Sequence, residues 1–158
     1  MHYAGIGSRE TPPDVQKEMT DIASWLMELG FVLRSGGADG ADKAFERGAG
    51  KAKQIFYASD CTAEAEAIAS TFHPAWHRCG PHARKLLGRN SFQIMGRSLT
   101  EPSLFVVCWT KNGSDEGGTG NAIRHAWSQG IPVFNLRNDN DREKLASHVS
   151  ALQSEKAS

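Results

Sequence analysis

Three glycine-rich segments carry the residue types that hold a phosphate group. Each combines glycines, which let the backbone approach a ligand closely, with hydroxyl, amide or guanidinium donors. In chain order, the members are Gly7, Ser8 and Arg9; Ser35, Gly36, Gly37 and Asp39; and Gly117, Gly118, Thr119, Gly120 and Asn121. Each segment follows an apolar run and leads into a helical pattern, so it ends at a helix N-terminus, whose free N–H groups favour an anion. The three segments therefore predict a phosphate-binding site.

The glycine spacing does not match two common nucleotide-binding motifs. The chain has no Gly-x-x-x-x-Gly-Lys-Ser/Thr segment, which disfavours an ATPase phosphate loop. The first segment keeps only Gly5 and Gly7 of the Gly-x-Gly-x-x-Gly pattern, so a conventional NAD site is not expected either. We expect no cofactor.

Short apolar runs alternate with helical patterns along the chain. We expect strands at 3–7, 31–35, 54–58, 104–109 and 131–136, and helices at 12–29, 41–49, 62–72, 81–98 and 141–152. Thr11 is the expected N-cap of the first helix, with Pro12 at its first position. This alternation predicts an α/β fold: a three-layer Rossmann-like single domain with a mainly parallel sheet of about five strands. Residues 1–158 would form that domain, with 153–158 as a frayed tail.

A parallel sheet would bring the glycine segments together. Turns that leave parallel strands gather at the carboxyl edge of the sheet, and ligands bind there where the strand order reverses. The helix at 81–98 should reach the same edge with Arg89, which could meet a phosphate or lie on the surface, and with Asn90, which could read a base. Trp76, in the preceding loop, could stack on a base or pack over the sheet.

Composition limits the partners and the compartment. The 158 residues carry 18 Lys plus Arg and 18 Asp plus Glu, so the formal net charge is zero and a large basic field for duplex DNA is not expected. No apolar run approaches the roughly 20 residues of a membrane span. The three cysteines form no disulfide framework, and no signal pattern opens the chain. We expect a cytoplasmic protein with no membrane contact.

A metal site is not expected. His73, His77, Cys79 and His82 give the spacing H-x3-H-x-C-x2-H, which is not a standard zinc pattern, and Pro74 and Pro81 interrupt it.

The glycine segments resemble motifs of the SLOG superfamily, which joins DNA-processing protein A with the Lonely Guy cytokinin-activating phosphoribohydrolases. The residues at 5–9 are similar to the first strand and loop of that superfamily, those at 33–42 to its Ser-Gly-Gly-Ala-x-Gly-x-Asp signature, and those at 117–122 to its third motif. Arg89-Asn90 is similar to an Arg-Asn pair of the DNA-processing family. Small stand-alone members from phages and prophages are especially similar. The resemblance implies a nucleotide-type ligand, enzyme activity in some members, and a homodimer with the helix at 81–98 as a candidate interface.

The chain departs from the hydrolase pattern Pro-Gly-Gly-x-Gly-Thr-x-x-Glu. Glu116 stands at the proline, Asn121 at the threonine and Arg124 at the catalytic glutamate. Glycosidic cleavage passes through a cation-like sugar that a carboxylate stabilises, whereas an arginine binds a phosphate bidentately. We therefore expect Arg124 to bind a phosphate, and whether the chain is an enzyme stays open. Other carboxylates that could contribute, or that only cap helices and face solvent, are Asp39, Asp42, Asp115 and Glu116.

Three functions follow from these patterns. The first is binding of a nucleotide or nucleotide-derived ligand by the glycine segments, in order to sense, sequester or process it. The second is single-stranded DNA binding in recombination, as in DNA-processing protein A, which the neutral charge predicts to be weak. The third is nucleotide N-glycosidase or phosphoribohydrolase activity.

Overall fold

The computed structural model describes residues 1–157 and contains one parallel sheet. Its strands are β1 (His2–Gly5), β2 (Val32–Ser35), β3 (Lys53–Ile55), β4 (Val106–Cys108) and β5 (Val133–Asn135), in the order β3-β2-β1-β4-β5. All neighbouring strands pair in parallel. The predicted α/β, Rossmann-like class with a sheet of about five strands is confirmed.

The strand order reverses between β1 and β4. From β1 the chain moves outward to β2 and β3, then crosses back to place β4 on the other side of β1. The register pairs Ala4 of β1 with both Arg34 of β2 and Val106 of β4. The loops that leave β1 and β4 therefore diverge from adjacent strand ends, which is where open parallel sheets bind ligands.

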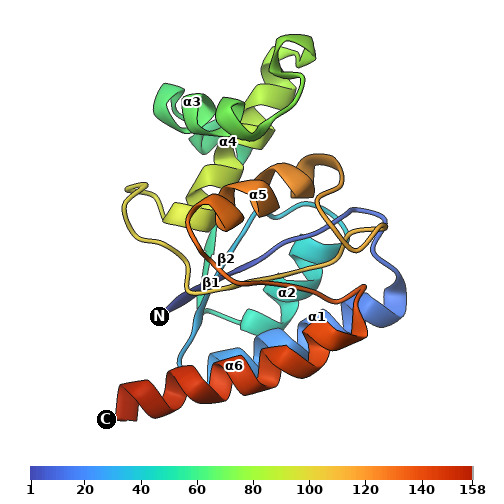
Figure 1. The fold of residues 1–158 in the computed structure, drawn as a ribbon, viewed down its shortest axis with the longest axis vertical. Helices are drawn as coiled ribbons and strands as arrows, with labels where there is room; N and C mark the ends of the chain where they lie inside the picture. Colours follow the sequence, from blue (N-terminus) through green and yellow to red (C-terminus); the bar gives the residue numbers. More distant parts are fainter. Residues whose placement is uncertain (158) are drawn as a thin grey trace.

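Helices α1 (Pro13–Glu28), α2 (Ala41–Ala49) and α6 (Asp139–Ala157) cover one face of the sheet (Figure 1). In α1 the buried residues Val15, Met19, Ala23 and Leu26 recur at helical spacing and pack against this face. Arg142 of α6 donates to both carboxylate oxygens of Glu18 in α1 at 2.8–3.1 Å, so the two helices are also joined by a bidentate ion pair.

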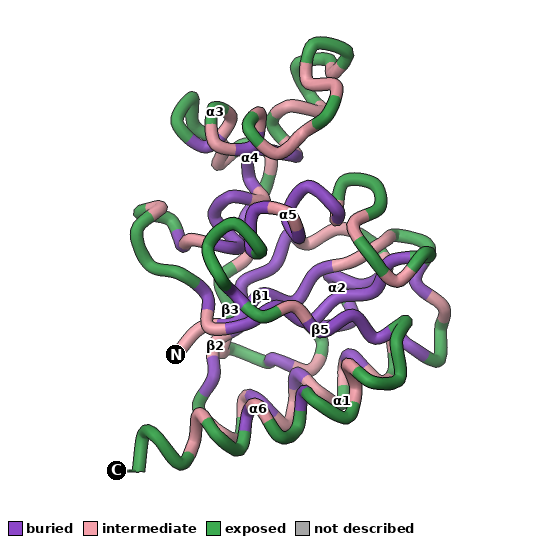
Figure 2. The backbone as a smooth tube through the Cα atoms, viewed as in Figure 1, coloured by how far each residue is buried: buried purple, intermediate pink, exposed green. Residues whose placement is uncertain are grey.

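Helices α4 (Pro81–Met95) and α5 (Gly117–Ser128) cover the other face, through a second apolar cluster that includes Ile94 and Ile123. Helix α3 (Ala63–Phe72) packs on α4 and α5 rather than on the sheet. The short 3₁₀ helices η1 (Ala58–Asp60) and η2 (Trp76–Arg78) lie on either side of α3 in the chain. The segment from α3 through η2 to the start of α4 projects from the body of the molecule, and we call it the projecting region. Its tip is exposed or half-buried (Figure 2).

The two helices predicted between 62 and 98 are present, and Thr62 caps α3 by accepting a hydrogen bond from the Ala65 amide at 3.2 Å. Some helix ends differ from the sequence-based expectation. Helix α1 begins at Pro13 because the Thr11 hydroxyl donates to the Ser8 carbonyl at 2.6 Å, which closes the loop after β1 instead of capping the helix.

Two further helix ends differ. Helix α4 stops at Met95, before Gly96 with its φ of +75°. Helix α6 continues through Ala157, where a frayed tail was expected from residue 153; Ser158 lies outside the described residues. None of the described helices is long and apolar enough to cross a membrane.

Candidate functional site

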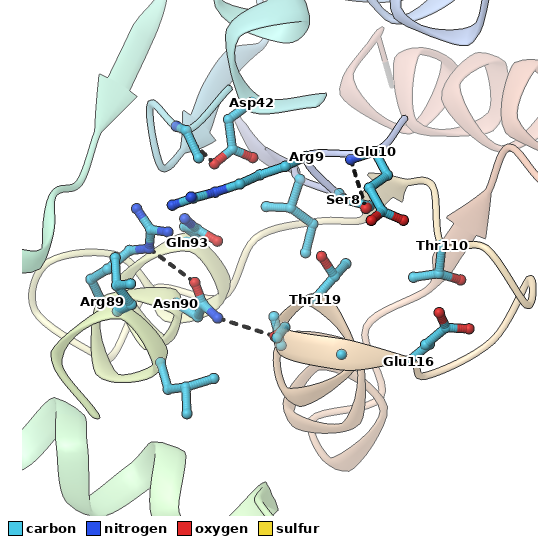
Figure 3. A pocket seen from close by; sticks show the side chains of 18 of the residues that line it. Ser8, Arg9, Glu10, Asp42, Arg89, Asn90, Gln93, Thr110, Glu116 and Thr119 are labelled. Atoms are coloured by element: carbon cyan, nitrogen blue, oxygen red, sulfur yellow. Dashed lines mark hydrogen bonds between the residues drawn. The ribbon is translucent and has the colours of Figure 1, made fainter. Parts of the chain in front are cut away.

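A cavity of about 520 Å³ opens at the point where the strand order reverses (Figure 3). Its walls come from the loops after β1, β2 and β4, from one side of α4 and from the start of α5. Among the residues expected from the sequence, the lining includes Gly7, Ser8, Arg9, Arg89, Asn90, Gly117, Gly118 and Thr119. The first and third glycine segments and the Arg89-Asn90 pair thus meet around one cavity.

Two buried charges form the inner end of the cavity. Arg89 is 8% exposed, and its Nη1 donates to the carbonyls of Gly36 at 2.7 Å and Phe56 at 3.1 Å. Asp42 is 4% exposed and accepts a hydrogen bond from the Ala38 amide at 3.2 Å. Burial raises the pKa of Asp42 to about 6, although the nearby Arg89 opposes that shift. The backbone bonds fix the orientation of Arg89 beside the cavity.

The Arg9 guanidinium lies over this inner end. Figure 3 shows its side chain extended toward Asp42, Gln93 and Arg89. Arg9 forms no hydrogen bond or ion pair with any other residue in the range 1–157, although its charge lowers the pKa of both Asp42 and Arg89. It is therefore a solvent-exposed cation that lines the cavity, and its five donors are available to a ligand.

The start of α5 supplies backbone donors on the opposite wall. The helix begins at Gly117, and Glu116 before it makes no capping hydrogen bond with its side chain. The first amides of a helix have no acceptor within the helix, so those of Gly117, Gly118 and Thr119 can bind an anion at the positive end of the helix dipole. Asn90 ties this wall to α4, because its Oδ1 accepts from Arg89 Nε at 3.0 Å and its Nδ2 donates to the Gly118 carbonyl at 3.3 Å.

The second glycine segment supports the cavity from outside its lining. Ser35 is buried and donates to the Gly5 carbonyl at 2.6 Å, while Gly36 packs directly against the Arg89 guanidinium. Gly37 lies against the ring of Tyr57. Asp39, expected near the ligand, is exposed and pairs with Lys43 at 3.0 Å. Between Ser35 and Asp42, only Ala38 within the segment and Asp42 after it line the cavity.

The later residues of the third segment contact α3 and the loop before α5 instead of the cavity. A Cβ on Gly120 would lie 2.5 Å from the Asp115 backbone, and the buried Asn121 donates to the Ala69 carbonyl at 3.3 Å.

Arg124 Nε donates to the Phe72 carbonyl at 2.8 Å, and its Nη1 donates to Asp115 Oδ2 at 3.1 Å and to Asp115 O at 3.2 Å. Arg124 is two residues beyond Ala122, which lines the cavity, and that step turns it about 200° round the helix. The guanidinium expected to hold a phosphate thus lies outside the lining.

Trp76 also lies away from the cavity, in η2 of the projecting region. The Arg84 guanidinium is 5.3 Å from its ring centroid and donates to the Trp76 carbonyl at 3.1 Å. Nearby, Cys79 Sγ is 3.7 Å from His73 Nε2, but no three His, Cys, Asp or Glu side chains in residues 1–157 are grouped so that they could hold a metal ion.

Sequence reasoning did not single out several lining residues, including Glu10, Leu86, Gln93, Thr110 and Lys111. Gln93 is one helical turn after Arg89, so the periodicity of α4 would have found it. Thr110 and Lys111 follow the end of β4 at the carboxyl edge of the sheet, where the topology places ligand contacts. Leu86 lies on the helix that the resemblance offers as a dimer interface, and it lines the cavity.

No protein-family model matches the chain, and no curated protein is similar enough in sequence to count as a relative. A solved structure of DNA processing protein A from Helicobacter pylori matches with a TM-score of 0.60 over 94% of this chain and 72% of that one. The two chains share a fold. Their sequence identity is 18%, so the similarity establishes the architecture alone. The Helicobacter pylori protein is described as binding single-stranded DNA.

Proposed function

We propose that this protein binds a nucleotide or nucleotide-derived ligand, with a phosphate group held between Arg9 and the start of α5. The observation that carries the proposal is the Arg9 guanidinium, which has no partner in residues 1–157 and lines the same cavity as the uncapped amides at the start of α5. The cavity volume of about 520 Å³ is in the range of about 300–1,000 Å³ that small-molecule sites occupy. Leu86 and Leu87 offer apolar surface for a base or sugar.

The charges of the lining favour a ligand with few phosphates. Three cations, Arg9, Arg89 and Lys111, are matched by three carboxylates, Glu10, Asp42 and Glu116. Glu10 and Glu116 lie on the side of the cavity opposite Arg89 (Figure 3). A single phosphate near Arg9 would avoid these carboxylates, which would repel a longer chain of phosphates but could accept hydrogen bonds from sugar hydroxyls or a base amino group.

Calorimetric titration with AMP and ADP-ribose tests this proposal. Loss of a charged hydrogen-bonding partner costs about 1.5–3 kcal/mol, so Arg9→Gln should weaken binding by about tenfold or more. Lys17→Gln is the matched control, because Lys17 is an exposed cation on α1 outside the cavity. If wild type binds neither ligand, or if Arg9→Gln binds as well as wild type, the proposed site is wrong.

Single-stranded nucleic acid is the second candidate ligand, and the charge of residues 67–100 favours it. This segment contains no Asp or Glu, and its exposed or half-buried cations are Arg78, Arg84, Lys85 and Arg97. Trp76 lies in the same segment, and basic side chains interleaved with aromatic ones suit single strands. The shared fold with a DNA-binding protein adds support, since a strand with one nucleotide in the cavity could continue along α4.

Fluorescence anisotropy with a labelled oligonucleotide separates the two candidates. If strands use the projecting region, the double variant Arg78→Gln/Lys85→Gln should weaken oligonucleotide binding several-fold and leave AMP binding unchanged. Both side chains are exposed, so the fold should tolerate the changes. Equal oligonucleotide affinity in wild type and variant would remove this region from the proposal.

We propose that the chain is a small, phage-like SLOG protein and a cytoplasmic homodimer. The motif resemblance supports the family and the dimer. Sedimentation would test the dimer. Binding without glycosidic cleavage is favoured over hydrolysis, since Arg124 replaces the hydrolase carboxylate. Release of free base from nucleoside monophosphates by wild-type protein would reverse that preference.

A further inference from the structure

A second cavity, of about 440 Å³, lies beside β2 and β3 at the C-terminal end of α4. Its lining includes Arg34, Gln54, Phe56, Arg97, Ser98 and Glu101. It shares no described lining residue with the cavity of about 520 Å³ described above, which we call the nucleotide cavity. The proposed function uses neither of the two arginines around this space.

Arg34 is a fully buried cation whose guanidinium forms hydrogen bonds within residues 1–157 through Nε and Nη1 but not through Nη2. Its side chain is 1% exposed. Nε donates to Gln54 Oε1 at 3.3 Å, and Nη1 donates to Glu101 O at 2.6 Å and to Ser103 Oγ at 3.1 Å. These bonds anchor the loop after α4 to β2, and they account for three of the five N–H groups of the guanidinium.

The Nη2 group of Arg34 makes no hydrogen bond within the described chain. Its nearest carboxylate oxygen, Oε2 of Glu101, is 3.6 Å away, beyond hydrogen-bond distance, and the Glu101 side chain is 70% exposed. Gly96 keeps this side of the guanidinium uncrowded, since a Cβ there would lie 2.8 Å from Nη2. A buried charge is thus paired only with a carboxylate that water largely surrounds.

Arg97 gives the cavity a second cation. Its guanidinium lies over the rings of Phe56 and Phe92, 5.1 and 5.9 Å from their centroids, and makes no ion pair in residues 1–157. The lining therefore holds two guanidinium groups and one carboxylate, and the cavity walls carry a formal excess of one positive charge. The Ser98 hydroxyl and the Gln54 amide add neutral donors.

We propose that this second cavity binds a phosphate group between Arg34 and Arg97, and that the Glu101 carboxylate is the intramolecular competitor that the phosphate displaces. A phosphate has enough oxygens to accept from the free Nη2 edge and from Arg97 together, which one carboxylate at 3.6 Å does not do. Displacing Glu101 costs little, because its carboxylate is already mostly hydrated.

Two-dimensional ¹H–¹⁵N NMR with inorganic phosphate tests this site directly. We expect saturable shifts of the Ser98 and Glu101 backbone amides and of the Gln54 side-chain amide, with sodium chloride at equal ionic strength giving no saturation. Glu101→Gln removes the competitor and should tighten phosphate binding by about tenfold, whereas Arg97→Gln should weaken it by about tenfold. Phosphate should also raise the Tm of Glu101→Gln more than that of wild type.

Arg9→Gln is the control for phosphate that binds in the nucleotide cavity, and it should leave these three shifts unchanged. Loss of the shifts in Arg9→Gln would mean that they report the nucleotide cavity and would overturn the proposal. Shifts that do not saturate, or equal affinity in wild type and Glu101→Gln, would show that Arg34 only anchors the loop. The result is independent of whether AMP binds elsewhere.

Discussion

The role of Arg124 depends on which way its side chain faces, and residue type alone does not give that direction. The sequence places an arginine one turn after a glycine loop, which is where a phosphate ligand is expected. Whether it faces the cavity depends on the phase of α5, and in the structure it reaches Phe72 and Asp115 instead. The short-range pattern therefore identified the helix start, while the partner 52 residues away in the chain could not be read from it.

Arg124→Lys should lower stability and leave nucleotide affinity nearly unchanged. A lysine keeps the charge but cannot donate to Phe72 and Asp115 together, so we expect a loss of about 1–2 kcal/mol in the free energy of unfolding. Urea denaturation and AMP titration of the same samples measure both quantities. The expectation from sequence was the opposite, and a large loss of affinity at unchanged stability would restore it.

Asp42 should make stability depend on pH between about 4 and 6. Its pKa is raised from 3.8 to about 6 by burial, so within this window the folded state holds a proton that the unfolded state has released. The contribution of this group to stability is therefore greatest at low pH and decreases as the pH rises, by at most about 1.4 kcal/mol per pH unit.

Asp42→Asn removes this titration. The difference in unfolding free energy between wild type and Asp42→Asn should fall as the pH rises from 4 to 6 and level off above about pH 7. Urea denaturation across this range measures it. A difference that is flat with pH would mean that Asp42 titrates near its ordinary pKa and that the inner end of the cavity is open to water.

At the scale of elements, the glycine loops differ in why they need glycine. A Cβ on Gly7 would lie 2.7 Å from the Ala41 Cβ and 3.1 Å from the Trp109 carbonyl, because the first loop packs on the second loop and on β4. Gly40, with a φ of +85°, similarly lies under the backbone of Ser8 and Arg9. A Cβ on Gly118 would meet nothing closer than Leu87 Cδ2 at 3.9 Å.

Gly118→Val and Gly7→Val should therefore have different effects. Gly118→Val should place its side chain toward the phosphate position and abolish AMP binding with less than about 1 kcal/mol lost in stability. Gly7→Val should destabilise by several kcal/mol through steric overlap inside the fold. Thermal denaturation alongside calorimetry distinguishes them, and AMP binding by Gly118→Val at wild-type affinity would remove the start of α5 from the site.

The strands and the order of helices were predictable because they depend on local periodicity. The five apolar runs and the helical patterns match the observed elements to within a few residues. The ends of α1 and α4 were missed because they depend on Thr11 bonding back to Ser8 and on the turn at Gly96. The second glycine segment was predicted to bind ligand but supports Arg89, because its burial follows from packing between β2 and α4.

For the whole molecule, charge balance predicts weak and only mildly salt-dependent binding of single strands. The net charge is zero and the nucleotide cavity is lined by equal numbers of cations and carboxylates, so few phosphates can be neutralised at once. The slope of log affinity against log salt should therefore be shallow, with about one or two phosphates engaged. A steep slope with nanomolar affinity at physiological salt would favour DNA over a free nucleotide as the main ligand.

The proposed function requires that a phosphate-bearing nucleotide occupies the cavity between Arg9 and α5. Mass spectrometry of the small molecules released when purified protein is denatured tests it most directly. We expect one nucleotide-type mass containing phosphate from wild-type protein and from the Lys17→Gln control, and none from Gly118→Val or Arg9→Gln. A nucleotide released equally from all four proteins, or no such mass from wild-type protein, would show that the cavity between Arg9 and α5 is not the nucleotide site.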